Sequence, residues 1–195
     1  MPFEFEKLDI PGLVLIRPQA FADERGFFME TYRLSDFAAA GIADRFVQSN
    51  VSYSKRGVLR GLHYQKQPKA QAKLVHVVAG EIYDVVVDLR EDSPSFGRWY
   101  ATVLSAENGR MLYVPPWCAH GFCVLSEEAR VAYSVTEEYS PELERGILWS
   151  DPALAISWPV EAPIVSPKDQ GLPLFAAADL DAAWPDPADA SLPRP

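Results

Sequence analysis

Hydrophobic and polar residues alternate along many short stretches of this chain, as expected where successive side chains point to opposite faces of a β-strand. Seventeen prolines and eleven glycines punctuate these stretches and mark turns between them. Short strands separated by such turns are typical of a sandwich or barrel rather than of alternating strands and helices. Eight strands are predicted, which suits a jelly roll: Leu13–Arg17, Val58–Gln65, Leu74–Ala79, Glu81–Leu89, Trp99–Ser105, Met111–Val114, Gly121–Ser126 and Arg130–Thr136.

The strand predicted over Glu81–Leu89 carries two carboxylates on one face. Alternation places Asp84 and Asp88 on the same side as Ile82 and Val86. The opposite side is apolar throughout and is predicted to be core. Asp84 lies in the middle of the strand, where a solvated end is not expected, so it is predicted either to face a polar cavity or to have a buried partner.

One short helix is predicted over Ser35–Ala40, with Ser35 as its cap and Gly41 as its stop. A chain of 195 residues suffices for one domain with a sizeable core, and we assign residues 1–183 to a single domain. A Pro-, Ala- and Asp-rich tail begins at Gly171. Its first half is a candidate for a short docked helix, and residues 184–195 are predicted to fray.

Composition and charge narrow the possible functions. The chain is 48% hydrophobic and 23% charged, as in globular proteins, and no apolar run approaches the ~20 residues that span a bilayer. Its first residues lack the basic region and apolar block of a secretory signal, so a cytoplasmic protein with no membrane partner is expected. The formal charge of -9 excludes a broad basic surface for nucleic acid. A small anionic ligand would need a local cluster of Arg and Lys.

The stretch from Gly57 to Val75 concentrates groups that are poor choices for burial, namely Arg60, His63 and Lys73. In an ideal strand Arg60 and His63 have opposite parity and cannot share a face. Gly61 between them would allow a bulge that brings both into one cavity. Taken singly, each has an ordinary explanation: Arg60 could form a surface ion pair, His63 could be a hydrogen-bonded structural histidine, and Lys73 could lie at a solvated strand end. Their joint occurrence around a glycine favours a site.

The histidines and cysteines do not form a metal-binding pattern. Metal-binding jelly rolls usually offer two histidines one residue apart on a strand, whereas "GLHYQ" contains only His63. A metal is therefore disfavoured, and His63 is free to act as a base. His76 is predicted to be core or interface, and His120, at the mouth of the barrel, is a binding candidate. Cys118 and Cys123 are predicted to be buried thiols.

Three further features of the sequence concern charged and aromatic residues. Arg25 and Glu30 flank the aromatic run in "FADERGFFMETYR", and Lys168 with Asp169 follows a proline in what is predicted to be an exposed loop. For such a Lys-Asp pair, a surface position is the ordinary interpretation. Tyr133 alternates with two valines and is predicted to point inward.

Several blocks together resemble the dTDP-4-dehydrorhamnose 3,5-epimerase family. They are "DERGFFMETYR", "FVQSNVSYS", "GVLRGLHYQ", "KLVHVVAGEIYDVVVDLREDSPSFGRW", "LSAENGRMLYVPPWCAHGFCVLS", "GILWSDPALAISWP" and "SPKD". The resemblance runs from about Phe21 to Pro173, in the family's order. It implies a mainly β, cupin-type jelly roll (a double-stranded β-helix) with few short helices, no metal or other cofactor, and a homodimer that exchanges N-terminal strands.

The resemblance also implies a reaction and a site. The substrate would be dTDP-4-dehydro-6-deoxy-D-glucose, inverted at carbons 3 and 5. His63 matches the general base, Tyr133 the acid and Asp169 the carboxylate that orients the base, while Lys73, with Arg60, would stabilise the enolate. Tyr139 matches the ring that stacks on thymine. Substrate contacts carry over to Arg25, Glu30, Gln48, Ser49, Asn50, Arg60, Lys73, His120, Glu144 and Lys168, of which Arg25, Arg60 and Lys168 would face the diphosphate.

Alternatives stay open at this point. The family usually has Gly-Phe where this chain has Trp117 and Cys118, and we expect the bulkier Trp117 beside His120 to reshape the sugar pocket. A related epimerase that inverts one centre, or takes another nucleotide, would use the same base and acid. A non-catalytic sugar-nucleotide-binding cupin predicts loss of the base or acid, yet His63, Tyr133 and Asp169 are present. A metal-dependent cupin is disfavoured by the missing histidine pair.

Overall fold

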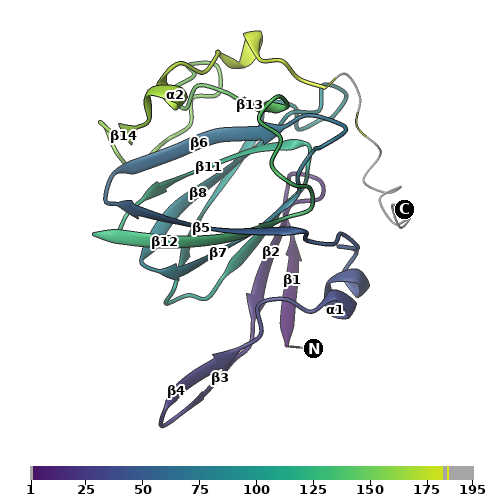
Figure 1. Ribbon diagram of the computed structural model, residues 1–195, viewed down its shortest axis with the longest axis vertical. Helices are drawn as coiled ribbons and strands as arrows, with labels where there is room; N and C mark the ends of the chain where they lie inside the picture. The colour runs from purple at the N-terminus through teal and green to yellow at the C-terminus, as the bar shows by residue number, and fades with distance from the viewer. Residues whose placement is uncertain (1, 182–183, 185–195) are drawn as a thin grey trace.

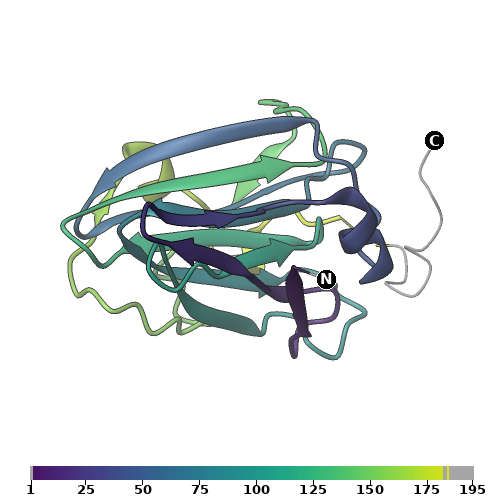
Figure 2. The same cartoon turned by 90° about the horizontal axis from the view of Figure 1, so that it is seen from below.

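The computed structural model, which describes residues 2–181 and 184, contains two sheets that face each other (Figures 1 and 2). Strand pairs are antiparallel, except that β14 joins β6 in parallel. The first sheet has the order β1 (Phe3–Lys7), β2 (Val14–Pro18), β10 (Met111–Val114), β7 (Lys73–Ala79), β12 (Glu128–Val135) and β5 (Gln48–Lys55). The second has the order β13 (Glu144–Gly146), β6 (Val58–Gln65), β11 (Cys118–Val124), β8 (Glu81–Asp88) and β9 (Trp99–Ser105), with β14 (Ile164–Val165) beside β6.

The predicted strands are all present, and three of them, β6, β9 and β10, have the predicted bounds. The others differ at their ends. Six strands were not predicted: β1, β5, β13 and β14, and the pair β3 (Ala20–Asp23) and β4 (Gly26–Met29). The case of β5 shows why: it is an edge strand whose inward positions, Gln48, Asn50, Ser52 and Ser54, are polar. Hydrophobic alternation therefore gives no signal there.

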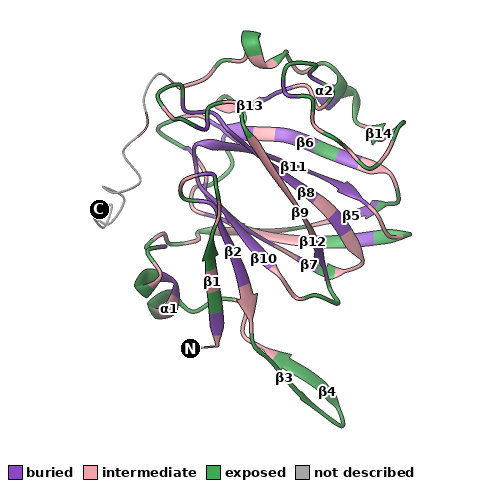
Figure 3. Ribbon diagram, turned by 180° about the vertical axis from the view of Figure 1, so that it is seen from behind, coloured by how far each residue is buried: buried purple, intermediate pink, exposed green. Residues whose placement is uncertain are grey.

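The main core lies between the two sheets, where Val75 and Leu112 from one sheet pack with Val86 and Phe122 from the other. A second apolar layer covers the opposite face of β8, because Val85 and Val87 pack against residues of the C-terminal segment, including Ile147, Leu154 and Trp158. Both faces of β8 are thus buried from Asp84 to Asp88, as Figure 3 shows.

The helices are short. Helix α1 spans Leu34–Ala39, and Ser35 lies inside it; the prediction that Ser35 caps it is wrong, because Arg33 occupies the N-cap without a side-chain hydrogen bond. The predicted stop at Gly41 is confirmed. Its φ of 91° lets Gly41 N and Ile42 N donate to carbonyls of the last turn. Further on, α2 spans Pro167–Gln170, and η1, a 3-10 turn over Phe175–Ala177, corresponds to the helix predicted in the tail.

The fraying predicted for residues 184–195 falls outside the described residues, apart from Trp184, whose ring lies 6.3 Å from that of Trp117. The division of the chain at residue 183 stays a prediction. In the described part of the chain, no helix is long and apolar enough to cross a membrane.

The hairpin β3–β4 extends away from the two sheets (Figures 1 and 3). Its aromatic side chains are unusually exposed, since Phe27 and Phe28 are 65% and 66% accessible. Arg25 at its tip is paired with Asp23 at 2.5 Å. A projecting hairpin with solvent-exposed phenylalanine side chains is typical of a surface that contacts another chain.

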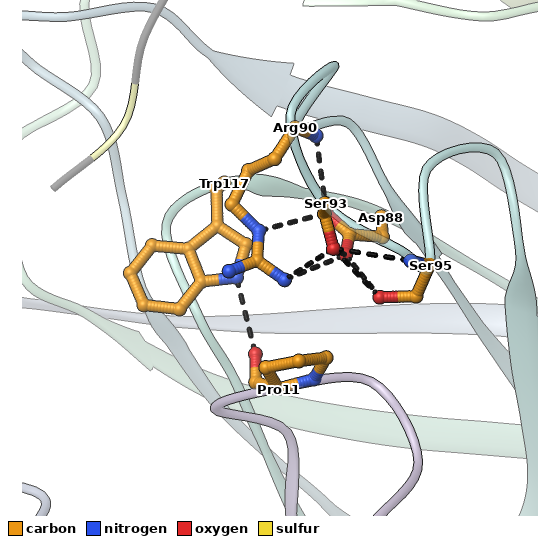
Figure 4. Close-up of polar contacts among 6 residues, drawn as sticks. All are labelled: Pro11, Asp88, Arg90, Ser93, Ser95 and Trp117. Carbon is orange, nitrogen blue, oxygen red and sulfur yellow. Dashed lines mark hydrogen bonds and ion pairs between the residues drawn. The ribbon is translucent and has the colours of Figure 1, made fainter. Parts of the chain in front are cut away.

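Trp117 belongs to a buried polar network at one end of the core rather than to the pocket (Figure 4). Its indole Nε1 donates to the Pro11 carbonyl at 3.2 Å, and the Arg90 guanidinium lies over its ring at 5.1 Å. Asp88 in turn accepts hydrogen bonds from Arg90, at 2.7 Å for Nη2, and from Ser95 at 2.7 Å. Trp117 lies in the turn before β11, packs in the core and is not among the residues that line the cavity described below; its expected effect on the sugar pocket stays a prediction.

Asp88→Asn is expected to lower the free energy of unfolding by about 3 kcal/mol, because it leaves the buried Arg90 cation without a counter-charge. Burial alone would raise the pKa of Asp88, but hydrogen bonds from Arg90 and Ser95 hold it below 3.8. Its stabilising contribution is thus present above pH 3.8 and lost as pH falls through the lower folded pKa. Urea unfolding at pH 7 and below pH 3.8 checks this; a difference between wild type and variant that does not shrink in acid would contradict it.

Candidate active site

A cavity of about 510 Å³ lies between the sheets and collects most of the predicted site residues. The second sheet contributes Arg60, His63 and His120, and the first contributes Lys73 and Tyr133. The other predicted residues in its lining are Tyr139, in the segment after β12, Glu144, at the start of β13, and Lys168 and Asp169, in α2.

The predicted bulge at Gly61 is confirmed and explains why Arg60 and His63 share the cavity. Along the pair β6–β11, His63 lies opposite His120 and Arg60 opposite Phe122, so two residues on β6 face one on β11. Gly61 has a φ of 123°, and a Cβ there would lie 2.6 Å from Gly121 Cα. Only glycine fits both the dihedral angle and the close strand approach.

His63 and Asp169 form a hydrogen-bonded pair, with 2.7 Å between Nε2 and Oδ1. Burial alone would raise the pKa of Asp169, but hydrogen bonds from His63, Gly61 N and Ser166 hold it below its usual value. The carboxylate therefore stays charged and orients the ring, which leaves Nδ1 as the free nitrogen of a half-buried imidazole. Asp169 itself is 4% exposed, so the surface interpretation of this residue is wrong.

The side chains of Lys73 and Tyr133 both point into the interior and line the cavity. Lys73 is 7% exposed, which makes the solvated strand end, its ordinary interpretation, wrong. Burial lowers the pKa of Lys73 to about 8. Tyr133 points inward as predicted, and burial raises the pKa of its hydroxyl. This tyrosine therefore keeps its proton at neutral pH.

The rim of the cavity holds a chain of polar contacts that is more exposed. Glu144 Oε2 accepts from Lys168 Nζ at 2.5 Å and from the Tyr139 hydroxyl at 2.6 Å. Tyr139 is 52% exposed, so one face of its ring is available to a ligand. Gln48 accepts from Tyr139 N at 3.0 Å, which supports the rim from β5.

Five predicted substrate contacts do not line the cavity within this protomer. Gln48 and Asn50 are bonded to each other at 2.9 Å on the inward side of β5, whereas Ser49 faces the other way, toward Ser134. Arg25 lies in the turn of the projecting hairpin and forms an ion pair with Asp23. Glu30 follows the hairpin and forms an ion pair with Arg33.

Sequence reasoning missed several lining residues, namely Ser52, Gln71, Phe122, Ile164, Val165 and Ser166. It did indicate Asp84 as a carboxylate in need of a partner, and the buried-partner alternative is confirmed, because His120 Nε2 lies 2.8 Å from Asp84 Oδ2. Cys118 and Cys123 are buried free thiols, as predicted. His76 is half-buried on β7.

A sequence model of the dTDP-4-dehydrorhamnose 3,5-epimerase family matches residues 7–177. This chain belongs to that family. A Shigella flexneri dTDP-4-dehydrorhamnose 3,5-epimerase is 52% identical over 89% of this chain and 96% of its own length. A dTDP-4-dehydrorhamnose 3-epimerase of Streptomyces niveus is 44% identical over 88% of this chain and 83% of its own.

Solved structures agree with the family assignment. The dTDP-6-deoxy-D-glucose-3,5-epimerase of Legionella pneumophila, solved in complex with dTDP-4-keto-L-rhamnose, is 47% identical and superposes with a TM-score of 0.87. The match covers 90% of this chain and 94% of that one. The cupin-type jelly roll of the dTDP-4-dehydrorhamnose 3,5-epimerase family, predicted for this chain, is confirmed.

Proposed function

We propose that the protein is a dTDP-4-dehydrorhamnose 3,5-epimerase, an isomerase that inverts carbons 3 and 5 of dTDP-4-dehydro-6-deoxy-D-glucose. One observation supports this most: His63, on β6 and hydrogen-bonded to Asp169, and Tyr133, on β12, come from opposite sheets and line the same cavity. A base on one wall and an acid on the other is what inversion requires, since the proton must leave one face of the sugar and return to the opposite one.

The same residues serve both carbons because both flank the ketone at carbon 4, which acidifies each attached proton. His63 Nδ1 removes a proton, and Asp169 stabilises the resulting imidazolium. Negative charge then develops on the oxygen at carbon 4, where the buried Lys73 ammonium supplies compensation in a site with little water. The Tyr133 hydroxyl delivers a proton to the other face.

The proposal is tested by NMR in deuterated water with enzymatically prepared dTDP-4-dehydro-6-deoxy-D-glucose and a rhamnose-forming reductase to trap the product. Deuterium at carbons 3 and 5, with dTDP-L-rhamnose formed, is the expected result. Deuterium at one carbon would instead support a single-centre epimerase, the alternative that the Streptomyces niveus relative keeps open. Exchange at neither carbon would overturn the assignment, and a non-catalytic binding protein would then be the better account.

The charge of Lys73 predicts how activity depends on pH. With a pKa of about 8 in the ligand-free protein, Lys73 is protonated below pH 8 and loses its charge above it. The rate constant kcat/KM is therefore expected to fall on the alkaline side of pH 8, because the neutral amine cannot offset the enolate charge. Lys73→Met should lower kcat by roughly a hundred-fold or more and remove this alkaline limb. A Lys73→Met profile with the limb intact would assign it to another group.

The proposal includes a homodimer in which the β3–β4 hairpin of each protomer reaches the partner's cavity. Support comes from the exposed Phe27 and Phe28 on this hairpin. Arg25 is also exposed, and it does not line the cavity of its own protomer. Arg25 would then meet the diphosphate together with Arg60 and Lys168. The homodimer and the cytoplasmic location stay predictions.

Mixing two inactive variants tests this exchange. Arg25→Ala and His63→Asn homodimers are each expected to be impaired. If Arg25 acts in the partner's site, a mixed dimer contains one site with both native residues and regains roughly half of one wild-type dimer's activity. If Arg25 acts in its own protomer, both sites of the mixed dimer lack one residue, and no activity returns after subunit exchange.

A further inference from the structure

A second histidine–carboxylate pair lies in the wall of the cavity, beside the first. His120 lines the cavity, and its Nε2 is 2.8 Å from Asp84 Oδ2. Asp84, on β8, is fully buried, and its other oxygen, Oδ1, has no hydrogen-bond partner within residues 2–181 and 184. The only nitrogen of His120 left to face the cavity is Nδ1.

The two carboxylates have different surroundings. Asp169 accepts from Gly61 N at 3.2 Å in addition to His63. Asp84 has the imidazole of His120 as its one donor in the described chain. A buried carboxylate with several donors is stable as an anion, whereas one with a single donor requires a full compensating charge or a proton of its own.

Counting protons defines the state of this pair. If His120 were neutral with its hydrogen on Nε2, a fully buried carboxylate would carry an uncompensated charge. Placing a proton on Asp84 Oδ1 would leave a buried O–H without an acceptor. Two arrangements avoid both penalties, and each has one proton between Asp84 Oδ2 and His120 Nε2. In the first, the proton is on Nε2, so a carboxylate faces an imidazolium; in the second, it is on Oδ2, so a carboxylic acid faces a neutral imidazole. Both have a second hydrogen on His120 Nδ1.

We propose that His120 is a hydrogen-bond donor to the substrate's oxygen at carbon 4, and that Asp84 is the positioning residue that keeps the hydrogen on Nδ1. This inference rests on the proposed function and deepens it. The strand register supports the placement, because His120 lies directly opposite His63 on the neighbouring strand. A donor one strand from the base suits an oxygen attached to the carbon next to the one that loses its proton.

Electrostatics agree with this arrangement. Burial raises the pKa of Asp84, opposed only in part by His120, whereas the pKa of Asp169 is lowered. Two carboxyl groups in one site with opposite shifts are typical of an acid and a base role for the residues they serve. His63 is then the base and His120 the donor.

The proton on Nδ1 can be observed without substrate. The chain has three histidines, so long-range ¹H–¹⁵N NMR of the ligand-free protein gives three sets of ring signals, which His76→Gln and His63→Asn assign. Wild-type His120 is expected to carry a hydrogen on Nδ1 at pH 7 to 8. An Nδ1 of His120 with the shift of an unprotonated acceptor would overturn the proposal.

Kinetics separate positioning from structural support. Asp84→Asn removes the shared charge and is expected to lower kcat roughly ten- to a hundred-fold with a smaller change in KM. Because Asp84 acts through His120, the double variant Asp84→Asn/His120→Asn should be no slower than His120→Asn alone. Additive losses in the double variant would contradict this, as would a wild-type kcat for Asp84→Asn.

Asp88→Asn is the matched control, since Asp88 is equally buried on the same strand but is bonded to Arg90 and Ser95 instead of to a histidine of the cavity. Measured at a temperature where it is folded, it should leave the His120 signals and kcat unchanged. The NMR result does not depend on turnover. If the wild-type protein exchanged no protons in the sugar, the proposed function would fail while the state of the Asp84–His120 pair would still be decided.

Discussion

Replacing His63 with Asn is expected to abolish deuterium incorporation at both carbons 3 and 5, with a loss of roughly a hundred- to ten-thousand-fold in kcat. The amide has no basic nitrogen, so neither proton can be removed, although a side chain of similar polarity still faces Asp169. Nucleotide affinity should change little, because the diphosphate contacts lie elsewhere. Proton exchange by NMR and dTDP binding by calorimetry together check this expectation.

His76→Asn provides the control for the loss of an imidazole as such, since His76 lies on β7 outside the cavity. It should exchange protons at the wild-type rate. Exchange at either carbon in His63→Asn, at a rate near that of wild type, would remove His63 as the common base and would direct attention to His120.

Tyr133→Phe is expected to separate proton removal from inversion. His63 remains able to take a proton and return it to the same face, so deuterium still enters the substrate. Delivery to the opposite face is lost, and product formation should fall by roughly a hundred-fold or more. The measurement is the ratio of solvent exchange to epimerisation, followed in a single NMR sample.

Tyr53→Phe is the matched control, because Tyr53 is exposed on β5 and its hydroxyl bonds to Glu128 at 2.8 Å, away from the cavity. It should leave the ratio unchanged. Equal losses of exchange and inversion in Tyr133→Phe would show that this tyrosine supports proton removal instead, and the opposite-wall mechanism would need a different acid.

Strand alternation was sufficient to predict the parts of the site that depend on local geometry. The position of Gly61 indicated a bulge that brings Arg60 and His63 together, and alternation placed Tyr133 inward; the structure has both features. These inferences succeeded because a bulge and a strand face are set by neighbours in the sequence.

Features that depend on contacts between residues far apart in the sequence could not be predicted from local patterns. Asp169 lies 106 positions after His63, and nothing local distinguishes its Lys-Asp dipeptide from an exposed loop; only the family resemblance assigned it a role. Trp117 was expected beside the pocket because it is close to His120 in the chain, yet it lies in the turn before β11 and its ring packs in the core. The hairpin with Arg25 gave no clear strand signal, because its stability does not rest on a buried face.

The long separation between His63 and Asp169 has a consequence for when the enzyme becomes competent. The strands that carry His63, Lys73 and Tyr133 belong to the sheets, whereas Asp169 arrives with α2, near the end of the described chain, held by the Ser166 cap and the bond from Gly61 N. A molecule with complete sheets but an undocked C-terminal segment would have a barrel and no oriented base. Activity therefore requires docking of the C-terminal segment in addition to formation of the sheets, and turnover during refolding should return no earlier than β-structure.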